Sequence, residues 1–224
     1  MPGIPTSVSG NGADSALSPL FGVDESWVQK ILEDVEKAIN QLIDEFRKNP
    51  YLHRVEHSLH CELYGLLVAS GVLGKTEDYG LVRPRRVQKE WPETIPRQKE
   101  DGTLHKRGNF DLVVLGPPEN GKSSSMLPDQ FKRGLIKPGI VIEIGLDYDV
   151  GHLDEDFKKL MNSKVCHGYL IHLSRRAHHA EHSMQWIREF DKKKNRGIKI
   201  AYAQQGKDGQ PWQYRKLGKN NIHS

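Results

Sequence analysis

Residues 109–115, Asn-Phe-Asp-Leu-Val-Val-Leu, and residues 139–146, Gly-Ile-Val-Ile-Glu-Ile-Gly-Leu, are the two stretches that decide the fold. Both are continuous apolar runs bounded by glycine or proline, a pattern typical of buried β-strands. Each run contains one acidic residue, Asp111 in the first and Glu143 in the second. Because a carboxylate on a buried strand is costly without a partner, these two acids are candidates for a functional site.

Helical and strand patterns surround these two runs. Helices are expected over residues 24–49, 52–69, 153–162 and 177–194, and further strands over residues 81–91, 168–173 and 197–203. The resulting order is α, α, β, β, β, α, β, α, β. It predicts an α/β protein with a central mixed β-sheet flanked by helices.

The chain of 224 residues fits one globular domain with short extensions. Half of residues 1–22 are Gly, Pro or Ser, which predicts a flexible N-terminal lead. The α/β domain is expected over residues 23–204 and a basic C-terminal tail over residues 205–224. No apolar run of about 18 residues is present, and the first residues lack the features of a secretory signal, so we expect no membrane span and a cytoplasmic location.

The charge of the chain is uneven. Lys and Arg number 33 against 29 Asp and Glu, for a net charge of +4, but residues 188–224 hold ten basic and three acidic side chains. This asymmetry suits a polyanionic partner such as nucleic acid. Lys192–Arg196 and Arg215-Lys216, with Trp212 and Tyr214 nearby, could grip phosphates, although a solvated terminus explains them equally well.

A third acid, Glu56, falls within the apolar face of the second expected helix, one turn before His60. It could form a structural pair with a neighbouring Arg or His, or it could join Asp111 and Glu143. If the strands of Asp111 and Glu143 pair, both carboxylates can point off one face, and the carbonyl of Ile144 could add a neutral oxygen. Mg²⁺ or Mn²⁺ prefers such oxygen ligands and activates water for attack on a phosphodiester.

On these residues the chain resembles the PD-(D/E)XK, or restriction-endonuclease-like, nuclease superfamily. The resemblance covers residues 50–203 and rests on Glu56 in Leu52–Leu59, Asp111 in Asn109–Val114, and Glu143 in Ile142–Gly145. It implies an αβββαβ core in which a strand Asp and a Glu-x-Lys on the next strand hold the metal, often helped by a helix Glu. Glu56, Asp111, Glu143 and Ile144 are therefore the expected metal ligands.

The chain departs from that pattern at Gly145, which stands where the family has its lysine. The lysine has moved to another element, or the site is inactive. Lys158 on the following helix is the first candidate for the displaced catalytic lysine, with Lys159 and Lys89 as alternatives. A literal Pro128-Asp129 also occurs, but its polar surroundings favour a loop, so Asp111 is the preferred acid.

Three other patterns compete with this reading. Gly116–Ser123 matches the phosphate-loop pattern G-x-x-x-x-G-K-[ST], but the serines and the proline that follow disfavour the helix that this motif requires. His178, His179 and His182 have the spacing of a helical zinc pair without a third ligand. His53, His57 and His60 are expected mostly at the surface, except that His60, one turn from Glu56, could join a metal or support its ligands. Cys61 and Cys166 are expected to be buried.

Together these features predict a metal-dependent nuclease that uses Mg²⁺ or Mn²⁺, with DNA a better candidate substrate than RNA. The expected catalytic residues are Glu56, Asp111, Glu143 and Lys158. The partner is nucleic acid, no membrane is involved, and a homodimer would suit symmetric cutting of two strands. The alternatives are a catalytically inactive nucleic-acid-binding protein of the same fold and a phosphate-loop nucleotide-binding protein.

Overall fold

A computed structural model describes residues 21–95, 102–103, 108–119, 125–163, 165–192, 197–207, 210–218 and 222–223. The expected N-terminal lead lies almost wholly outside these ranges. The central feature is a mixed sheet whose strands lie side by side in chain order. Its six strands are β1 (Val87–Pro92), β2 (Asn109–Val114), β3 (Ile140–Leu146), β4 (His167–Ser174), β5 (Ile198–Gln204) and β6 (Gln213–Arg215), and a two-residue strand β7 (Ile222–His223) extends the edge.

The sheet is antiparallel at both ends and parallel in the middle. Strands β1, β2 and β3 form an antiparallel meander, β3, β4 and β5 run parallel, and β6 returns antiparallel to β5. The parallel pairs need crossover helices, which are α4 (Val150–Asn162) and α5 (Ala180–Lys192). The expected α/β architecture with a mixed sheet between helices is confirmed.

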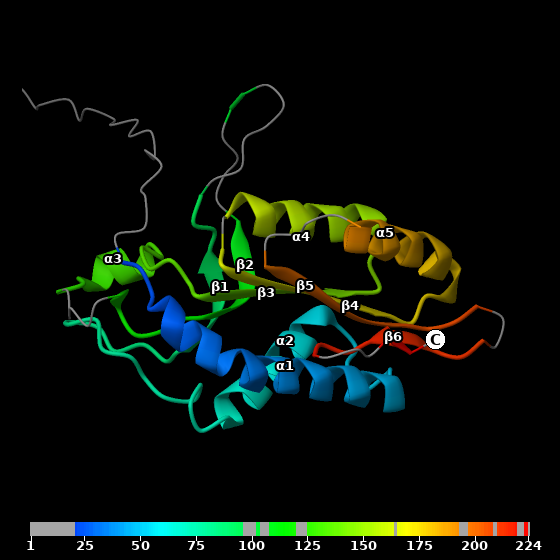
Figure 1. Cartoon of the computed structure of the whole chain (residues 1–224), viewed down its shortest axis with the longest axis horizontal. Helices are drawn as coiled ribbons and strands as arrows, with labels where there is room; N and C mark the ends of the chain where they lie inside the picture. The colour runs from blue at the N-terminus through cyan, green and yellow to red at the C-terminus, as the bar shows by residue number, and fades with distance from the viewer. Residues whose placement is uncertain are drawn as a thin grey trace, which may run out of the picture.

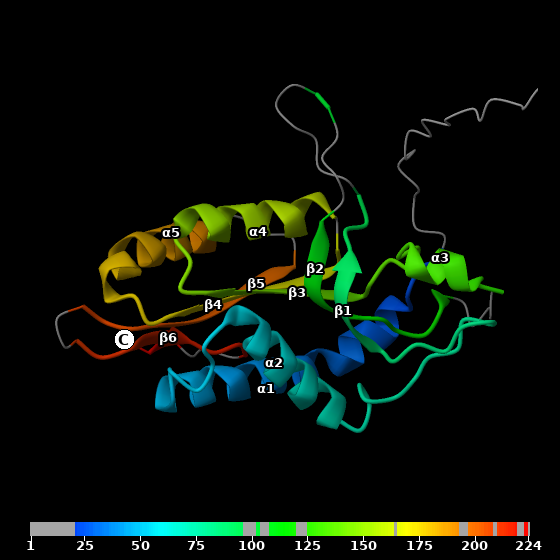
Figure 2. The ribbon, with the colours of Figure 1, turned by 180° about the vertical axis from the view of Figure 1, so that it is seen from behind.

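Helices cover both faces of the sheet (Figures 1 and 2). One layer contains α1 (Glu25–Lys48) and α2 (Glu56–Ala69), and the opposite layer contains α4 and α5. Helix α1 buries one apolar stripe, and its N-terminus is capped by Asp24, whose side chain accepts from the backbone N–H groups of Ser26 and Trp27. A short helix, α3 (Pro128–Lys132), precedes β3 and holds the Asp129 of the literal Pro-Asp pair.

Several boundaries differ from the sequence expectation. Helix α2 begins at Glu56 rather than Leu52, because residues 50–55 form a loop whose Pro50 and His53 carbonyls accept from the guanidinium of Arg175. Leu52, expected on the apolar face of that helix, is therefore exposed. Residues 213–215, expected in a tail, form β6 of the sheet.

Three burial expectations were wrong. Cys61 is exposed and Cys166 is only partly buried, with its thiol 2.9 Å from Glu25 Oε1. His53, expected at the surface, is buried, as is His60, the histidine expected to be able to join a metal. As expected, none of the helices in the described ranges combines the length and apolar character needed to cross a bilayer.

Candidate functional site

The site lies where strands β2 and β3 separate. Their ladder ends at Leu112 and Ile142, so that Asp111 stands opposite Glu143 in the next position of the register. Beyond that point, the carboxylates of Asp111 and Glu56 accept hydrogen bonds from backbone donors of β3. The N–H of Ile144 donates to Asp111 Oδ2 at 2.7 Å, and the N–H of Leu146 donates to Glu56 Oε2 at 3.2 Å. One stretch of β3 therefore gathers acids from a second strand and from a helix.

Glu143 is the most deeply buried of these acids, with 1% of its surface exposed. Its Oε2 accepts from Lys159 Nζ at 2.8 Å, whereas its Oε1 is buried and has no hydrogen-bond partner in the described part of the chain. Lys159 projects from α4, on the opposite face of the sheet from α2, and also contacts Asp156 Oδ1 at 3.3 Å. Helix α4 thus supplies both the ammonium that contacts Glu143 and a further carboxylate beside that ammonium.

The structure brings Lys159, rather than Lys158, to the carboxylates. Lys158 lies on the outer side of α4, where it pairs with Asp154 at 2.6 Å and keeps 68% of its side chain exposed. Neighbouring residues of a helix point about 100° apart, so only one of the two lysines can face the sheet. The third candidate, Lys89, reaches His57 Nε2 and Cys61 Sγ on α2 instead.

The space that a lysine at position 145 would need is taken by Tyr148. A Cβ atom on Gly145 would approach Tyr148 Cδ2 to 3.0 Å. Tyr148 is hydrogen-bonded through its side chain to Glu56 and stacks on His152, with 4.2 Å between the ring centroids. Gly145 therefore makes room for a tyrosine that holds Glu56, while α4 supplies the ammonium from the other side.

Asp147, the residue that follows β3, has a partner outside the group of acids. Its carboxylate accepts from the backbone N–H and the guanidinium of Arg175. This ion pair links the end of β3 to the loop that leads into α2, because the same guanidinium donates to the carbonyls of Pro50 and His53. Asp147 thus positions the loop before Glu56, and the role of the Ile144 carbonyl as a ligand stays a prediction.

Burial governs the electrostatics of the site. It raises the pKa of Asp111 to about 6 and the pKa of Glu143 well above its ordinary range, and the Asp111 charge raises the latter further. Burial also raises the pKa values of Glu56 and Asp156. For Lys159, the attraction of Glu143 and Asp156 outweighs burial and raises its pKa. When the four carboxyl groups are ionised, one ammonium leaves an excess of negative charge, which a divalent cation would compensate.

His60 lies between two of the acids. Its Nε2 is 3.7 Å from Glu56 Oε1 and 3.6 Å from Asp111 Oδ2. Burial lowers the pKa of His60, so the ring is neutral at neutral pH and does not balance the charge of the carboxylates. A neutral imidazole is a metal ligand, which makes His60 a candidate to join the acids.

Glu56, Asp111 and Glu143 are each held by a hydrogen bond to another group, not by contact with one another. In the described part of the chain, the three side chains whose ligand atoms all lie within 4.8 Å of one another are His57, His60 and Glu90, not the three carboxylates. Lys159 and the two backbone N–H groups hold one oxygen each of Glu143, Asp111 and Glu56. The structure therefore gathers Glu56, Asp111, Glu143 and Lys159 around the place where β2 and β3 separate, and their sharing of one ion stays a prediction.

The phosphate-loop pattern and the Pro-Asp pair are not part of this site. Gly121, Lys122 and Ser123 of the phosphate-loop pattern lie outside the described residues. Its first glycine has a packing role, since a Cβ on Gly116 would lie 2.4 Å from Val23 Cγ1. Asp129 of the Pro-Asp pair is an exposed side chain of α3 beside Lys132.

The basic C-terminal residues are engaged within the fold. Arg215 pairs with Asp191 of α5, and Lys216 pairs with Asp44 of α1. Trp212 packs edge-on against Phe46 at 5.8 Å between ring centroids. These residues attach β6 to the helices, whereas Lys193–Arg196 of the expected phosphate-binding segment lie outside the described residues.

No protein-family model, no curated protein and no solved structure matches the chain. The geometry and chemistry of the site are therefore the grounds for its function.

The raised pKa of Asp111 predicts a pH-dependent stability. A group whose pKa rises from 3.8 to about 6 on folding favours the protonated native state. Its stabilising contribution is fully present below about pH 4 and is lost as the pH rises through about 6. Relative to Asp111→Asn, the free energy of unfolding of the metal-free protein should fall by up to about 3 kcal/mol over that window. Urea unfolding of both proteins at a series of pH values measures this change. If the difference between their free energies of unfolding is the same at every pH, the burial of this carboxyl group is contradicted.

Proposed function

We propose that the protein is a metal-dependent nuclease with its centre at Glu56, Asp111, Glu143 and Lys159. The observation that carries the proposal is the buried Glu143, whose one oxygen contacts Lys159 and whose other oxygen has no hydrogen-bond partner. A buried, unpaired carboxylate oxygen is costly unless it binds a ligand. With Asp111 directly opposite, the ligand that fits is a hard divalent cation, Mg²⁺ or Mn²⁺.

The order of the elements supports the resemblance to the PD-(D/E)XK superfamily. Helix α2, strands β1, β2 and β3, helix α4 and strand β4 come in the order of the αβββαβ core that the resemblance implies, with the short helix α3 inserted between β2 and β3. The acids occupy the expected helix and strands, and the ammonium arrives from α4 rather than from position 145. The reason for considering an inactive descendant of the fold was the missing lysine, and Lys159 supplies that charge.

Each of these residues has a separate role in the proposed hydrolysis of a phosphodiester. Glu56, Asp111 and Glu143 would hold the cation, and Tyr148 and the N–H groups of Ile144 and Leu146 fix the orientation of two of the acids. Once bound, the cation supplies a polarised phosphate and a more acidic water. Lys159 contacts Glu143, Asp156 and the carbonyl of Asn109, and in the proposed reaction it would exchange one of these acceptors for a phosphate oxygen and stabilise the charge that develops in the transition state.

The loop before α2 supports nucleic acid as the substrate class. Tyr51, Leu52 and Val55 are exposed apolar side chains within five residues of Glu56. Arg175 lies over the Tyr51 ring, with 5.4 Å between Cζ and the ring centroid. An exposed aromatic ring beside a phosphodiester-cleaving centre suits stacking on a base, as in proteins that bind single strands.

Incubation with single- and double-stranded DNA and with RNA, in Mg²⁺ or in EDTA, tests the proposal. We expect cleavage that requires Mg²⁺ and that Glu143→Gln reduces by at least about a thousandfold, because the variant loses a ligand and the partner of Lys159. Glu62→Gln, on the same helix as Glu56, is the matched control and should cleave normally. If the wild type and both variants bind nucleic acid equally well and none of them cleaves it in Mg²⁺, the result would favour the binding protein instead.

A further inference from the structure

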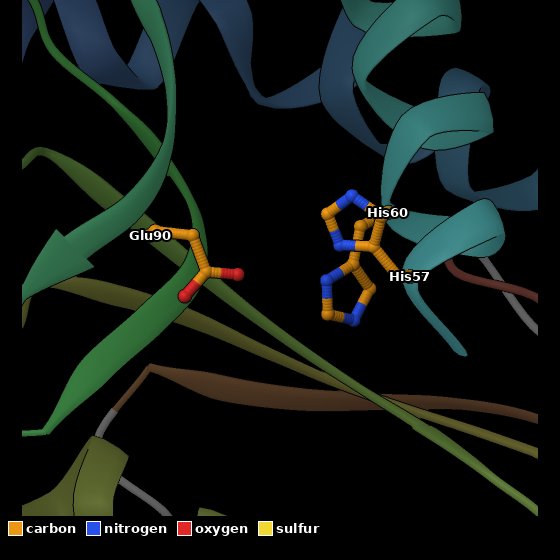
Figure 3. A group of neighbouring side chains, drawn as sticks. All are labelled: His57, His60 and Glu90. Atoms are coloured by element: carbon orange, nitrogen blue, oxygen red, sulfur yellow. The ribbon is translucent and has the colours of Figure 1, made fainter. Parts of the chain in front are cut away.

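A second group of possible metal ligands lies next to the carboxylate site. His57 and His60 stand one turn apart on α2, and Glu90 reaches them from β1. One nitrogen of each imidazole and one oxygen of Glu90 all lie within 4.8 Å of one another. Figure 3 shows one carboxylate oxygen of Glu90 on the side that faces the two imidazole rings. Three donors from two elements therefore face a common point.

The backbone of β1 is distorted at the residue that completes this group. Glu90 has a φ of 52°, in the left-handed region that residues other than glycine rarely adopt. The β1–β2 ladder pairs Lys89 with Leu112 and Trp91 with Phe110 but has no pair at Glu90. As a result, the consecutive side chains of Lys89 and Glu90 both reach α2, although neighbours on a regular strand point to opposite faces. Such strain is concentrated at functional sites.

His60 provides a second, independent observation. It is 96% buried, since only 4% of its surface is exposed, and neither ring nitrogen has a hydrogen-bond partner among the residues that the structure describes. A buried imidazole normally satisfies at least one nitrogen, and a bound ion would do so here. Because Nε2 of His60 also lies within 3.7 Å of Glu56 and Asp111, an ion on this ring would sit beside the carboxylate centre.

We propose that His57, His60 and Glu90 form a binding site for a transition-metal ion of the Zn²⁺ or Co²⁺ class, separate from the Mg²⁺ ligands. Two imidazoles and one carboxylate match the ligand set of three-ligand zinc sites, which keep a fourth position open. Imidazole nitrogen favours such ions over Mg²⁺, which takes oxygen ligands. The site is defined by its ligands and does not depend on nuclease activity.

Lys89 acts against a cation at this site. Its Nζ is 3.4 Å from His57 Nε2 and 3.2 Å from Cys61 Sγ. An ion bound through His57 must displace this ammonium, which repels it. Removal of the charge in Lys89→Met should therefore tighten ion binding, an effect opposite in sign to that of removing a ligand.

Titration of the full-length protein with Co²⁺, followed by visible absorption and calorimetry in excess Mg²⁺, tests the proposal. We expect one Co²⁺ per chain in a site that Mg²⁺ does not empty. Because His57 and Glu90 are exposed, His57→Ala and Glu90→Gln should fold, and each should weaken Co²⁺ binding at least about tenfold. His178→Ala, at another exposed histidine, and Glu62→Gln are the matched controls and should bind as the wild type does.

Two results would overturn the site. One is the absence of Co²⁺ binding in the wild type, and the other is unchanged affinity in both His57→Ala and Glu90→Gln, which would place the ion elsewhere. A protein that binds Co²⁺ as described but cleaves no nucleic acid supports this site and contradicts the proposed nuclease. A protein that cleaves nucleic acid in Mg²⁺ but does not bind Co²⁺ as described contradicts this site and supports the proposed nuclease.

Discussion

Replacement of Asp111 with asparagine is expected to abolish Mg²⁺-dependent cleavage and, at the same time, to make the metal-free protein more stable at pH 7.5. Cleavage is lost because the amide is a poor ligand for a hard cation. Stability increases because the variant removes a buried charge that lies against Glu143, while its amide oxygen still accepts from the N–H of Ile144. With a pKa of about 6 in the native state, ionisation of Asp111 costs up to about 3 kcal/mol. A rise of about 5 °C in Tm is expected.

Scanning calorimetry with and without Mg²⁺ measures the expected change in the stability of Asp111→Asn. Mg²⁺ should raise the Tm of the wild type and leave that of Asp111→Asn unchanged, since only the wild type binds the ion at this place. Asp129→Asn changes the exposed acid of the literal Pro-Asp pair and is the matched control. A lower Tm for Asp111→Asn than for the wild type would show that the carboxylate has a structural role, and the metal proposal would fail.

Replacement of Lys159 with methionine should slow cleavage by about a hundredfold to a thousandfold, the effect of removing one charged donor from a transition state. Lys158→Met changes the neighbouring residue on the same helix and should have no comparable effect, because that side chain points outward and pairs with Asp154. Single-turnover cleavage rates at saturating Mg²⁺ compare the two variants directly.

A structural role for Lys159 is separated from a catalytic one by substrate binding. In the catalytic case, Lys159→Met retains Mg²⁺ binding and nucleic-acid affinity, and Lys159→Arg recovers part of the rate. In the structural case, the unpaired Glu143 destabilises the fold, and all three properties decline together. Equal rates for Lys158→Met and Lys159→Met would contradict the assignment of the lysine.

The sequence predicted the acids better than the lysine. Asp111 and Glu143 stand out because each interrupts an apolar run, and the pairing of their strands follows from chain order. The lysine depends on the rotation of α4 about its axis, which a helix starting at Val150 rather than Leu153 helps to set. Sequence patterns place Lys158 and Lys159 on the same helix but do not say which one faces the sheet.

Other parts of the site depend on features that a sequence does not display. The role of Tyr148 follows from the missing side chain at Gly145, which only the three-dimensional distance between them reveals. Glu90 reaches the histidines because its backbone leaves the β region, whereas strand alternation would direct it away from Lys89's side. Asp156 carried a signal, its i, i+3 spacing from Lys159, but that spacing is common on solvated helices.

Strand β6 has a consequence for how copies of the chain can associate. It covers the outer edge of β5 and is fastened by the ion pairs of Arg215 and Lys216 to two helices. An uncovered edge strand is a template on which another chain can add its own strand. The parallel strands are therefore not exposed at this end of the sheet, and another chain could pair with β5 only after residues 213–215 are stripped from it.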